Sequence, residues 1–181
     1  MRKIIKTLLG LCLLLTLTSC ASQVNKIYYD FNTETNEYSV YSNSRGYTDE
    51  TLFIKGNHNY KPVTAVNNYG FKGFYRIEHL VVEEGIIWIG EEAFFACEKL
   101  ESVTLPSTLK VIGREAFKGC ISLENVSMYS NIDSIDRNAF SECDNLKTIE
   151  FNGTMENAKK MLSGLVLKSV TIVCSDGEYT I

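Results

Sequence analysis

Four cysteines in the C-terminal half of the chain have a residue type and spacing that could bind a metal or form disulfides. Cys97, Cys120 and Cys143 follow one another at intervals of 23 residues, and Cys174 comes later. If these equivalent positions stack about 5 Å apart, their Cα atoms fall within disulfide range. Their Cβ atoms would point in parallel, which disfavours both a disulfide and the tetrahedral convergence that zinc requires. We therefore expect a column of small, buried hydrophobic side chains.

The histidines and carboxylates offer no second cluster for catalysis or metal binding. His58 and His79 are the two histidines, and neither has a Cys, Asp or Glu partner at metal-ligand spacing. Glu83-Glu84 and Glu91-Glu92 are adjacent pairs, whereas acid–base catalysis needs two carboxylates across a cleft, so we interpret them as solvated turn residues. The sequence contains neither a nucleophile elbow nor a phosphate-binding loop. These patterns predict a protein that is not an enzyme and that uses no cofactor or metal.

Cys20 has the sequence context of a modification site. Three cations, Arg2, Lys3 and Lys6, precede a mostly apolar run over 7–18. That run is shorter than the about 20 residues of a membrane-spanning helix, so the pattern is typical of a secretory signal. The stretch Leu17-Thr18-Ser19-Cys20 resembles the lipobox of bacterial lipoproteins.

The lipobox resemblance implies a bacterial source and a diacylglyceryl group on the Cys20 sulfur. Acylation at two or more positions would anchor the protein stably to the membrane of the cell envelope. The chain is then expected to start with a lipoprotein signal peptide over 1–19, followed by the lipidated cysteine and a short tether over 20–26. Secretion without the lipid is the alternative.

The rest of the chain repeats with a period of 23 residues, and the cysteines form one column of that repeat. Units begin at Val63, Ile86, Leu109 and Ile132, and a degenerate unit begins at Met155. A phenylalanine recurs in each complete unit, at positions 71, 94, 117 and 140. A fixed period in this range is typical of a solenoid, in which stacked units bury a continuous core. The phenylalanine column should therefore carry much of the stability.

Each unit is predicted to contain one strand, and the strands should stack into a parallel ladder. Val103 and Leu105 alternate with polar residues, as do their equivalents in the other units, which is the period-two pattern of a half-buried strand. The residues that point outward from this ladder form the candidate binding face: His79, Val81, Ser102, Thr104, Asn125, Ser127, Thr148 and Glu150.

A turn is predicted four positions after the start of each unit. The residues there are Asn67, Gly90, Gly113 and Asp136, which tolerate a left-handed backbone better than most residues do. A short helical turn that ends at the cysteine position should follow. The architecture as a whole is therefore a solenoid, mainly β with short helical turns.

Both ends of the repeats over 63–154 are expected to be capped. The N-terminal β cap over 27–62 reads as strands at 27–31, 37–41 and 51–55 and is rich in tyrosine, whose ring can be buried while its hydroxyl stays wet. An aromatic platform for a sugar or peptide is the alternative. The C-terminal capping repeat over 155–181 should contain an amphipathic helix at 155–165 and a strand at 170–174. An atypical last unit predicts that the solenoid ends there.

The repeat is similar to a known bacterial family. Leu100, Val103, Leu105, Pro106, Leu109, Ile112, Gly113, Ala116, Phe117 and Cys120 match position by position the 23-residue leucine-rich repeat of BspA-like surface proteins. The likeness extends over 63–181, and 27–62 resembles the strand-rich lead-in of the same family. It implies a leucine-rich-repeat solenoid on the cell surface that takes part in adhesion or partner binding. It implies no catalytic residue.

Composition narrows the classes of partner. The 181-residue chain has a net charge of −4 and becomes more acidic once its cationic start is removed, so contacts with nucleic-acid phosphates are not expected. We expect a monomeric binding module, anchored to the envelope by lipid, that recognises a protein or a glycan. The alternatives are a structural, self-assembling surface protein without a ligand and a carbohydrate-binding module.

Overall fold

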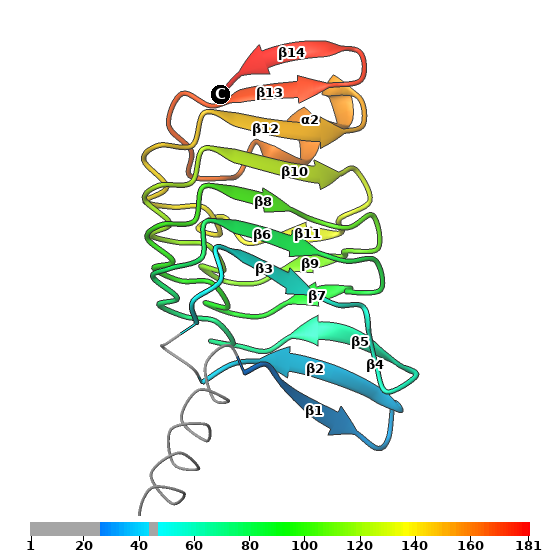
Figure 1. The fold of residues 1–181 in the computed structure, drawn as a ribbon. Coiled ribbons are helices and arrows are strands. Elements are labelled where there is room, and N and C mark those ends of the chain that lie inside the picture. The colour runs from blue at the N-terminus through cyan, green and yellow to red at the C-terminus, as the bar shows by residue number, and fades with distance from the viewer. Residues whose placement is uncertain (1–25, 44–46) are drawn as a thin grey trace, which may run out of the picture.

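The structure is a computed structural model that describes residues 26–43 and 47–181, and it has two sheets and one helix in these residues (Figure 1). The predicted signal peptide, Cys20 and most of the tether lie outside the described residues. The front sheet runs from the C-terminal end to the N-terminal end in the order β14 (Gly177–Thr180), β13 (Thr171–Cys174), β12 (Thr148–Asn152), β10 (Asn125–Tyr129), β8 (Ser102–Thr104), β6 (His79–Val82) and β3 (Thr51–Ile54). The back sheet contains β1 (Tyr28–Asn32), β2 (Glu37–Tyr41), β5 (Lys61–Val66), β7 (Trp88–Ile89), β9 (Val111–Ile112) and β11 (Ser134–Ile135), and β4 (Asn57–His58) pairs with β5.

The predicted solenoid with a parallel ladder is confirmed, but each repeat contributes two strands rather than one. The long strand lies in the front sheet, and a two-residue strand lies in the back sheet. Trp88 pairs with Val111, and Ser134 pairs with the same Val111 from the other side, again at the 23-residue interval. Period-two alternation cannot be recognised in a strand of two residues, so the second ladder was missed.

The core is a set of residue columns between the two sheets. Phe71, Phe94, Phe117 and Phe140 stack with successive ring centroids 5.4, 5.2 and 5.2 Å apart and ring planes within 8° of parallel. All four are buried. One repeat cannot bury its own apolar side, so this contact between coils is what makes the stack stable.

The glycine column has a different role from the one predicted. Gly90 and Gly113 do not have positive φ; the left-handed residues lie further along each turn, at Glu92 and Ala96 in one coil. A Cβ on Gly113 would instead lie 2.8 Å from the backbone carbon of Gly90. Glycine is therefore needed there because neighbouring coils approach each other closely.

The segment after each glycine forms tight turns on one side of the solenoid. In one coil the amides of Ala93, Phe95 and Cys97 each donate to the carbonyl three residues earlier, as in a 3-10 helix. The left-handed residues interrupt this pattern before a regular helix can form.

Hydrogen bonds between coils run in opposite directions on different sides of the stack. On the turn side each coil donates forward along the chain, as from Phe94 N–H to the Ala116 carbonyl (2.8 Å). Where the chain enters a front-sheet strand, each coil donates backward, as from Glu101 N–H to the Glu78 carbonyl (2.7 Å).

The N-terminal region supplies an additional coil. The predicted strands at 37–41 and 51–55 appear as β2 and β3, and they pair in parallel with β5 and β6. Thr51 pairs with His79, which is 28 positions later instead of 23, so the sequence period does not reveal this coil. β1 is antiparallel to β2 and covers the N-terminal edge of the back sheet.

The C-terminal end combines a helix with a hairpin. Helix α2 (Met155–Leu162) begins at the cap residue Thr154, whose side chain accepts a hydrogen bond from the Asn157 amide, and it ends three residues earlier than predicted. β13 agrees with the predicted strand within one residue, and the unpredicted β14 pairs antiparallel with it. Across 26–43 and 47–181, no helix combines the length and apolar character needed to cross a membrane.

Candidate binding face of the front sheet

The eight residues of the candidate binding face lie on the front sheet and point away from the core. Their neighbours in each strand, such as Leu80 and Val103, are buried, as alternation requires. Thr104, Asn125 and Glu150 are exposed, and the other five are half-buried. The strand register aligns them in two rows across β6, β8, β10 and β12: His79-Ser102-Asn125-Thr148 and Val81-Thr104-Ser127-Glu150.

Both rows are longer than the sequence indicates. On β3, Thr51 aligns with His79 and Phe53 with Val81; on β13, Thr171 and Val173 continue the rows beyond β12. Phe53 is 52% exposed and Val173 is 38% exposed, so an apolar side chain stands at each end of the second row. Phe53 was missed because its strand does not obey the 23-residue period, but the alternation in Thr51–Ile54 is a signal that could have located it.

The middle of the face carries small hydrogen-bonding groups. His79 Nδ1 lies 2.9 Å from Ser102 Oγ, and this contact holds the imidazole against the neighbouring strand. Within the part of the chain that the structure describes, the side chains of Thr104, Asn125 and Ser127 make no hydrogen bond to other protein groups. They are available to a partner that supplies donors or acceptors.

The face is shallow. Of the cavities in the described residues, one of about 570 Å³ adjoins the face at the Phe53 end, lined by Tyr47, Thr48, Asp49, Glu50, Thr51 and Phe53. Small-molecule sites are concave and enclose most of their ligand, whereas a flat, rigid sheet suits an extended macromolecular surface.

The predicted cysteine column is confirmed as a packing feature. Cys97, Cys120 and Cys143 are free and buried, and each thiol donates to the carbonyl of a phenylalanine in the preceding coil, at 3.3, 3.3 and 3.2 Å. Burial raises the pKa of the Cys120 thiol well above its ordinary value, so it stays protonated. Cys174 is free and half-buried. In residues 26–43 and 47–181, no group of three Cys, His, Asp or Glu side chains could hold a metal ion.

The glutamate pairs link coils instead of forming a solvated rim. Glu91 accepts hydrogen bonds from the Tyr69 hydroxyl (3.1 Å) and from Arg114, and Glu92 pairs with Lys72 at 2.5 Å. The Arg114 guanidinium and then the Tyr69 hydroxyl lower the pKa of Glu91. These contacts join three coils on the turn side. The contacts of Glu91 and Glu92 were missed because these residues were interpreted only as turn residues, without considering side chains about 23 positions away in the adjacent coils.

The Glu83-Glu84 pair is also engaged between coils. The Glu84 carboxylate accepts hydrogen bonds from the Ser107 amide (2.8 Å), the Ser107 hydroxyl (3.0 Å) and the Thr108 amide (3.1 Å). The Ser107 amide is the main cause of the lowered pKa of Glu84, since a hydrogen bond to the ionised form favours that form. Glu83 accepts a longer bond, of 3.4 Å, from the Gly56 amide.

The N-terminal tyrosines pack mainly on one another. Tyr28 stacks on Tyr41 with centroids 5.4 Å apart, and His58 stacks on Tyr29 at 3.8 Å and meets the edge of Tyr38. Burial raises the pKa of the Tyr29 hydroxyl. These contacts occupy ring faces of Tyr28, Tyr29, Tyr38 and Tyr41 and favour the cap interpretation over an open aromatic platform, although Tyr60 is fully exposed.

Comparison with known families identifies one match. Residues 64–177 match the family described as "BspA type Leucine rich repeat region" in six copies. A search of curated proteins finds no relative.

Solved structures of other bacterial leucine-rich repeat proteins have the same fold. A leucine-rich cell surface protein of Faecalibacterium prausnitzii shares 19% identity over 86% of this chain, with a TM-score of 0.64, and this chain spans 39% of its length. A leucine-rich repeat protein of Bacteroides capillosus is 20% identical over 72% of this chain and 96% of its own, with a TM-score of 0.62. One from Bacteroides ovatus is 23% identical over 83% of this chain and 36% of its own, with a TM-score of 0.59. At these identities the similarity establishes the fold.

Proposed function

Because the chain belongs to the BspA-type leucine-rich-repeat family, we propose that it is a cell-surface binding module that recognises a protein or glycan through its front sheet. The observation that carries the proposal is the pair of continuous rows across β3, β6, β8, β10, β12 and β13. Stacked parallel strands hold the outward side chains at fixed spacing, so the face is ordered before a partner arrives, which lowers the entropic cost of binding. In this proposal the protein acts by adhesion or protein binding and does not catalyse a reaction.

The proposed location is the bacterial cell envelope, with the solenoid exposed on the surface. The lipobox-like sequence before Cys20 supports anchoring through lipid on that cysteine. The described solenoid begins at Lys26, so a tether of a few residues would connect the lipid to the first strand. A cell surface protein among the structures of the same fold is consistent with this location.

Lipid anchoring is tested by expressing the full chain in a bacterium together with a Cys20→Ala variant. The original chain should partition with membranes and incorporate labelled fatty acid, whereas the variant should do neither. Labelling that persists in the variant would place the modification elsewhere.

The binding face is tested with a soluble form that begins at Ala21. It is screened against matrix proteins, cell-wall glycans and whole cells beside a variant carrying Ser102→Arg, Asn125→Arg and Thr148→Arg. A control variant adds the same charge at exposed positions on the turn side, through Tyr75→Arg, Ile121→Arg and Val166→Arg. A partner that the face variant loses and the control keeps supports the proposal. A partner that both variants keep would place recognition elsewhere.

One observation favours a second candidate, a structural protein that stacks end to end. The front sheet terminates in strands that lack a partner on their outer side within the described residues, β3 at one end and β14 at the other. Unpaired strand edges are templates for pairing with another chain. Sedimentation of the soluble form distinguishes the candidates, because a binding module of this kind is expected as a monomer and a stacking protein as an oligomer.

A further inference from the structure

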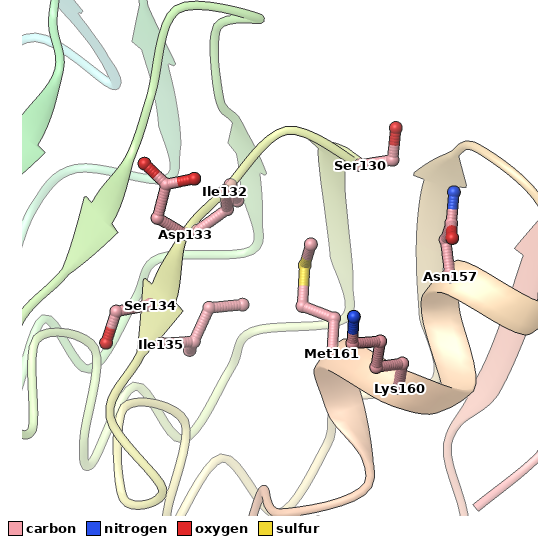
Figure 2. Close-up of a pocket in the computed structure, with 8 residues that line it drawn as sticks. All are labelled: Ser130, Ile132, Asp133, Ser134, Ile135, Asn157, Lys160 and Met161. Atoms are coloured by element: carbon pink, nitrogen blue, oxygen red, sulfur yellow. The ribbon is translucent and has the colours of Figure 1, made fainter.

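The back sheet ends at β11, beside an open cleft that helix α2 lines on the other side. Within the described residues β11 pairs with β9 alone, so its other edge has no strand partner. A cavity of about 540 Å³ lies between this edge and helix α2, which also contacts β11. Figure 2 shows β11 on one side of the cleft and side chains of α2 on the other. The lining residues are Ser130, Ile132, Asp133, Ser134, Ile135, Asn157, Lys160 and Met161.

The 23-residue repeat explains why the cleft exists. The positions that would follow Ser134 and Ile135 in the ladder are Asn157 and Ala158, one period later. These residues lie in α2 instead, so the next strand of the back sheet is missing. The ladder is broken only locally, because the coil contact resumes where the Val166 amide donates to the Arg137 carbonyl (2.9 Å).

The free edge of β11 carries backbone groups in the pattern that a further strand would use. Ser134 and Asp136 donate to the carbonyls of Lys110 and Ile112 in the preceding coil, at 3.1 and 3.0 Å. Since successive residues of a strand direct their backbone groups to opposite sides, the amide and carbonyl of Ile135 face the cleft. A strand added in parallel would donate to the Ile135 carbonyl and accept from its amide.

We propose that this cleft binds an extended peptide segment of a partner protein, which adds to β11 as the missing parallel strand. Addition of a strand to a free sheet edge is an established mode of peptide recognition, with affinity from the main chain and specificity from alternate side chains. The residues that face the core in the existing strands of this ladder are Val66, Ile89, Ile112 and Ile135. The segment therefore carries a β-branched aliphatic residue at the position that meets Ile135 and Met161.

Two charged side chains in the cleft indicate the direction in which the segment runs and the charges that flank its aliphatic residue. Asp133 immediately precedes β11, and Lys160 projects from α2 on the opposite wall next to Met161 (Figure 2). Neither side chain forms an ion pair within the described part of the chain. We expect the segment to run parallel to β11. A basic residue before its aliphatic position would then face Asp133, and an acidic residue after that position would face Lys160.

The test uses a probe that copies the protein's own ladder. A blocked hexapeptide, Leu-Lys-Val-Ile-Gly-Glu, reproduces residues 109–114 with glutamate in place of Arg114, and it is labelled with a fluorophore. Binding to the full chain in mild detergent is followed by fluorescence polarisation. Amide resonances of the labelled protein are followed in parallel. We expect weak, saturable binding and a shift of the Ile135 amide, with no change at Ile112 in the interior strand β9.

Three matched controls make the result specific. N-methylation of the peptide's glycine removes the donor to the Ile135 carbonyl and should weaken binding by about tenfold, the effect of losing one hydrogen bond. Asn157→Trp fills the cleft and should abolish binding. Glu156→Trp, an equal change on α2 outside the cleft, should leave binding intact.

Three outcomes would overturn the proposal. Absence of saturable binding, or binding that survives Asn157→Trp, would show that the cleft is not a strand-addition site. The protein could instead form a concentration-dependent dimer that Asn157→Trp dissociates and that the hexapeptide does not disrupt. Such a dimer would assign the cleft to a second copy of this chain instead of a partner peptide. The front-face Arg variant should bind the hexapeptide normally, so failure of this proposal and failure of the proposed function remain distinguishable.

Discussion

The rings of Phe94 and Phe117 stack with centroids 5.2 Å apart and planes 6° from parallel, although the two residues belong to different repeats. Each ring is fully buried, and Phe117 is stacked equally closely on Phe140 from the other side. The phenylalanine column therefore connects successive coils by ring stacking through the centre of the molecule.

We predict that Phe117→Ala lowers the free energy of unfolding by about 3–5 kcal/mol, because it removes a buried aromatic side chain and leaves a cavity between two rings. The measurement is urea denaturation of the soluble form that begins at Ala21. Ile121→Ala, at an exposed position of the same coil, should change stability by less than about 0.5 kcal/mol. An unfolding midpoint that Phe117→Ala hardly moves would show that the column does not stabilise the stack.

Gly113→Ala should destabilise the protein by about 1–3 kcal/mol, because the new methyl group would lie within 3 Å of three backbone atoms of Ile89, Gly90 and Glu91. Backbone atoms cannot move aside as a flexible side chain can. Gly164→Ala is the matched control, since no atom lies within 4 Å of its added Cβ. Equal stability of the two variants would remove close coil packing as the reason for glycine at position 113.

Stability should depend on the ionisation of Glu84. The folded state lowers the pKa of Glu84 through the Ser107 amide, so its ionised form is favoured by folding. The ionised Glu84 side chain should contribute about 1 kcal/mol to the free energy of unfolding, because it is an exposed carboxylate with such bonds. This stabilisation should be fully present above the unfolded-state pKa of about 4.3 and should be lost as the pH falls through the lower pKa of the folded state.

The measurement compares the original chain with Glu84→Gln by urea denaturation from pH 7 to pH 2. The difference in unfolding free energy should shrink below pH 4.3 or so. Glu98→Gln serves as a control, because the Glu98 side chain makes no hydrogen bond within the described residues. A Glu84→Gln difference that stays constant across this range would contradict the ionic contribution.

The thiols should react at very different rates in the native protein. Cys174 is half-buried, whereas Cys97, Cys120 and Cys143 are buried. The soluble form should show one thiol that reacts with a disulfide reagent at moderate speed, and a Cys174→Ser variant should lose this phase. All four thiols should react after denaturation. Fewer than four would indicate a disulfide in the isolated protein.

The repeated core could be predicted from the sequence because each coil places the same residue type at the same position. The Phe and Cys columns and the outward rows on β6, β8, β10 and β12 follow directly from the 23-residue interval. The front-sheet positions of all eight predicted face residues agree with their expected orientation.

Features that depart from the interval could not be predicted in this way. The Thr51–His79 pairing at 28 positions hides the N-terminal coil and with it Phe53. The cleft beside β11 arises because Asn157 and Ala158 lie in a helix instead of a strand. The helix could be predicted from its apolar spacing, but the cavity between the helix and β11 could not. Contacts of Glu84 and Glu91 with the next coil depend on side-chain geometry, which spacing alone does not determine.

The opposed directions of the hydrogen bonds between coils have an electrostatic consequence for the ends of the solenoid. Aligned peptide dipoles make the two ends of an α-helix partly charged. Here the forward bonds of the turn side, such as Phe94 to Ala116, and the backward bonds at the strand entries, such as Glu101 to Glu78, point their dipoles in opposite senses along the axis. The dipoles offset one another, so adding coils lengthens the stack without building up a field along it. Such a protein can vary its number of repeats without having to change the charges at its two ends.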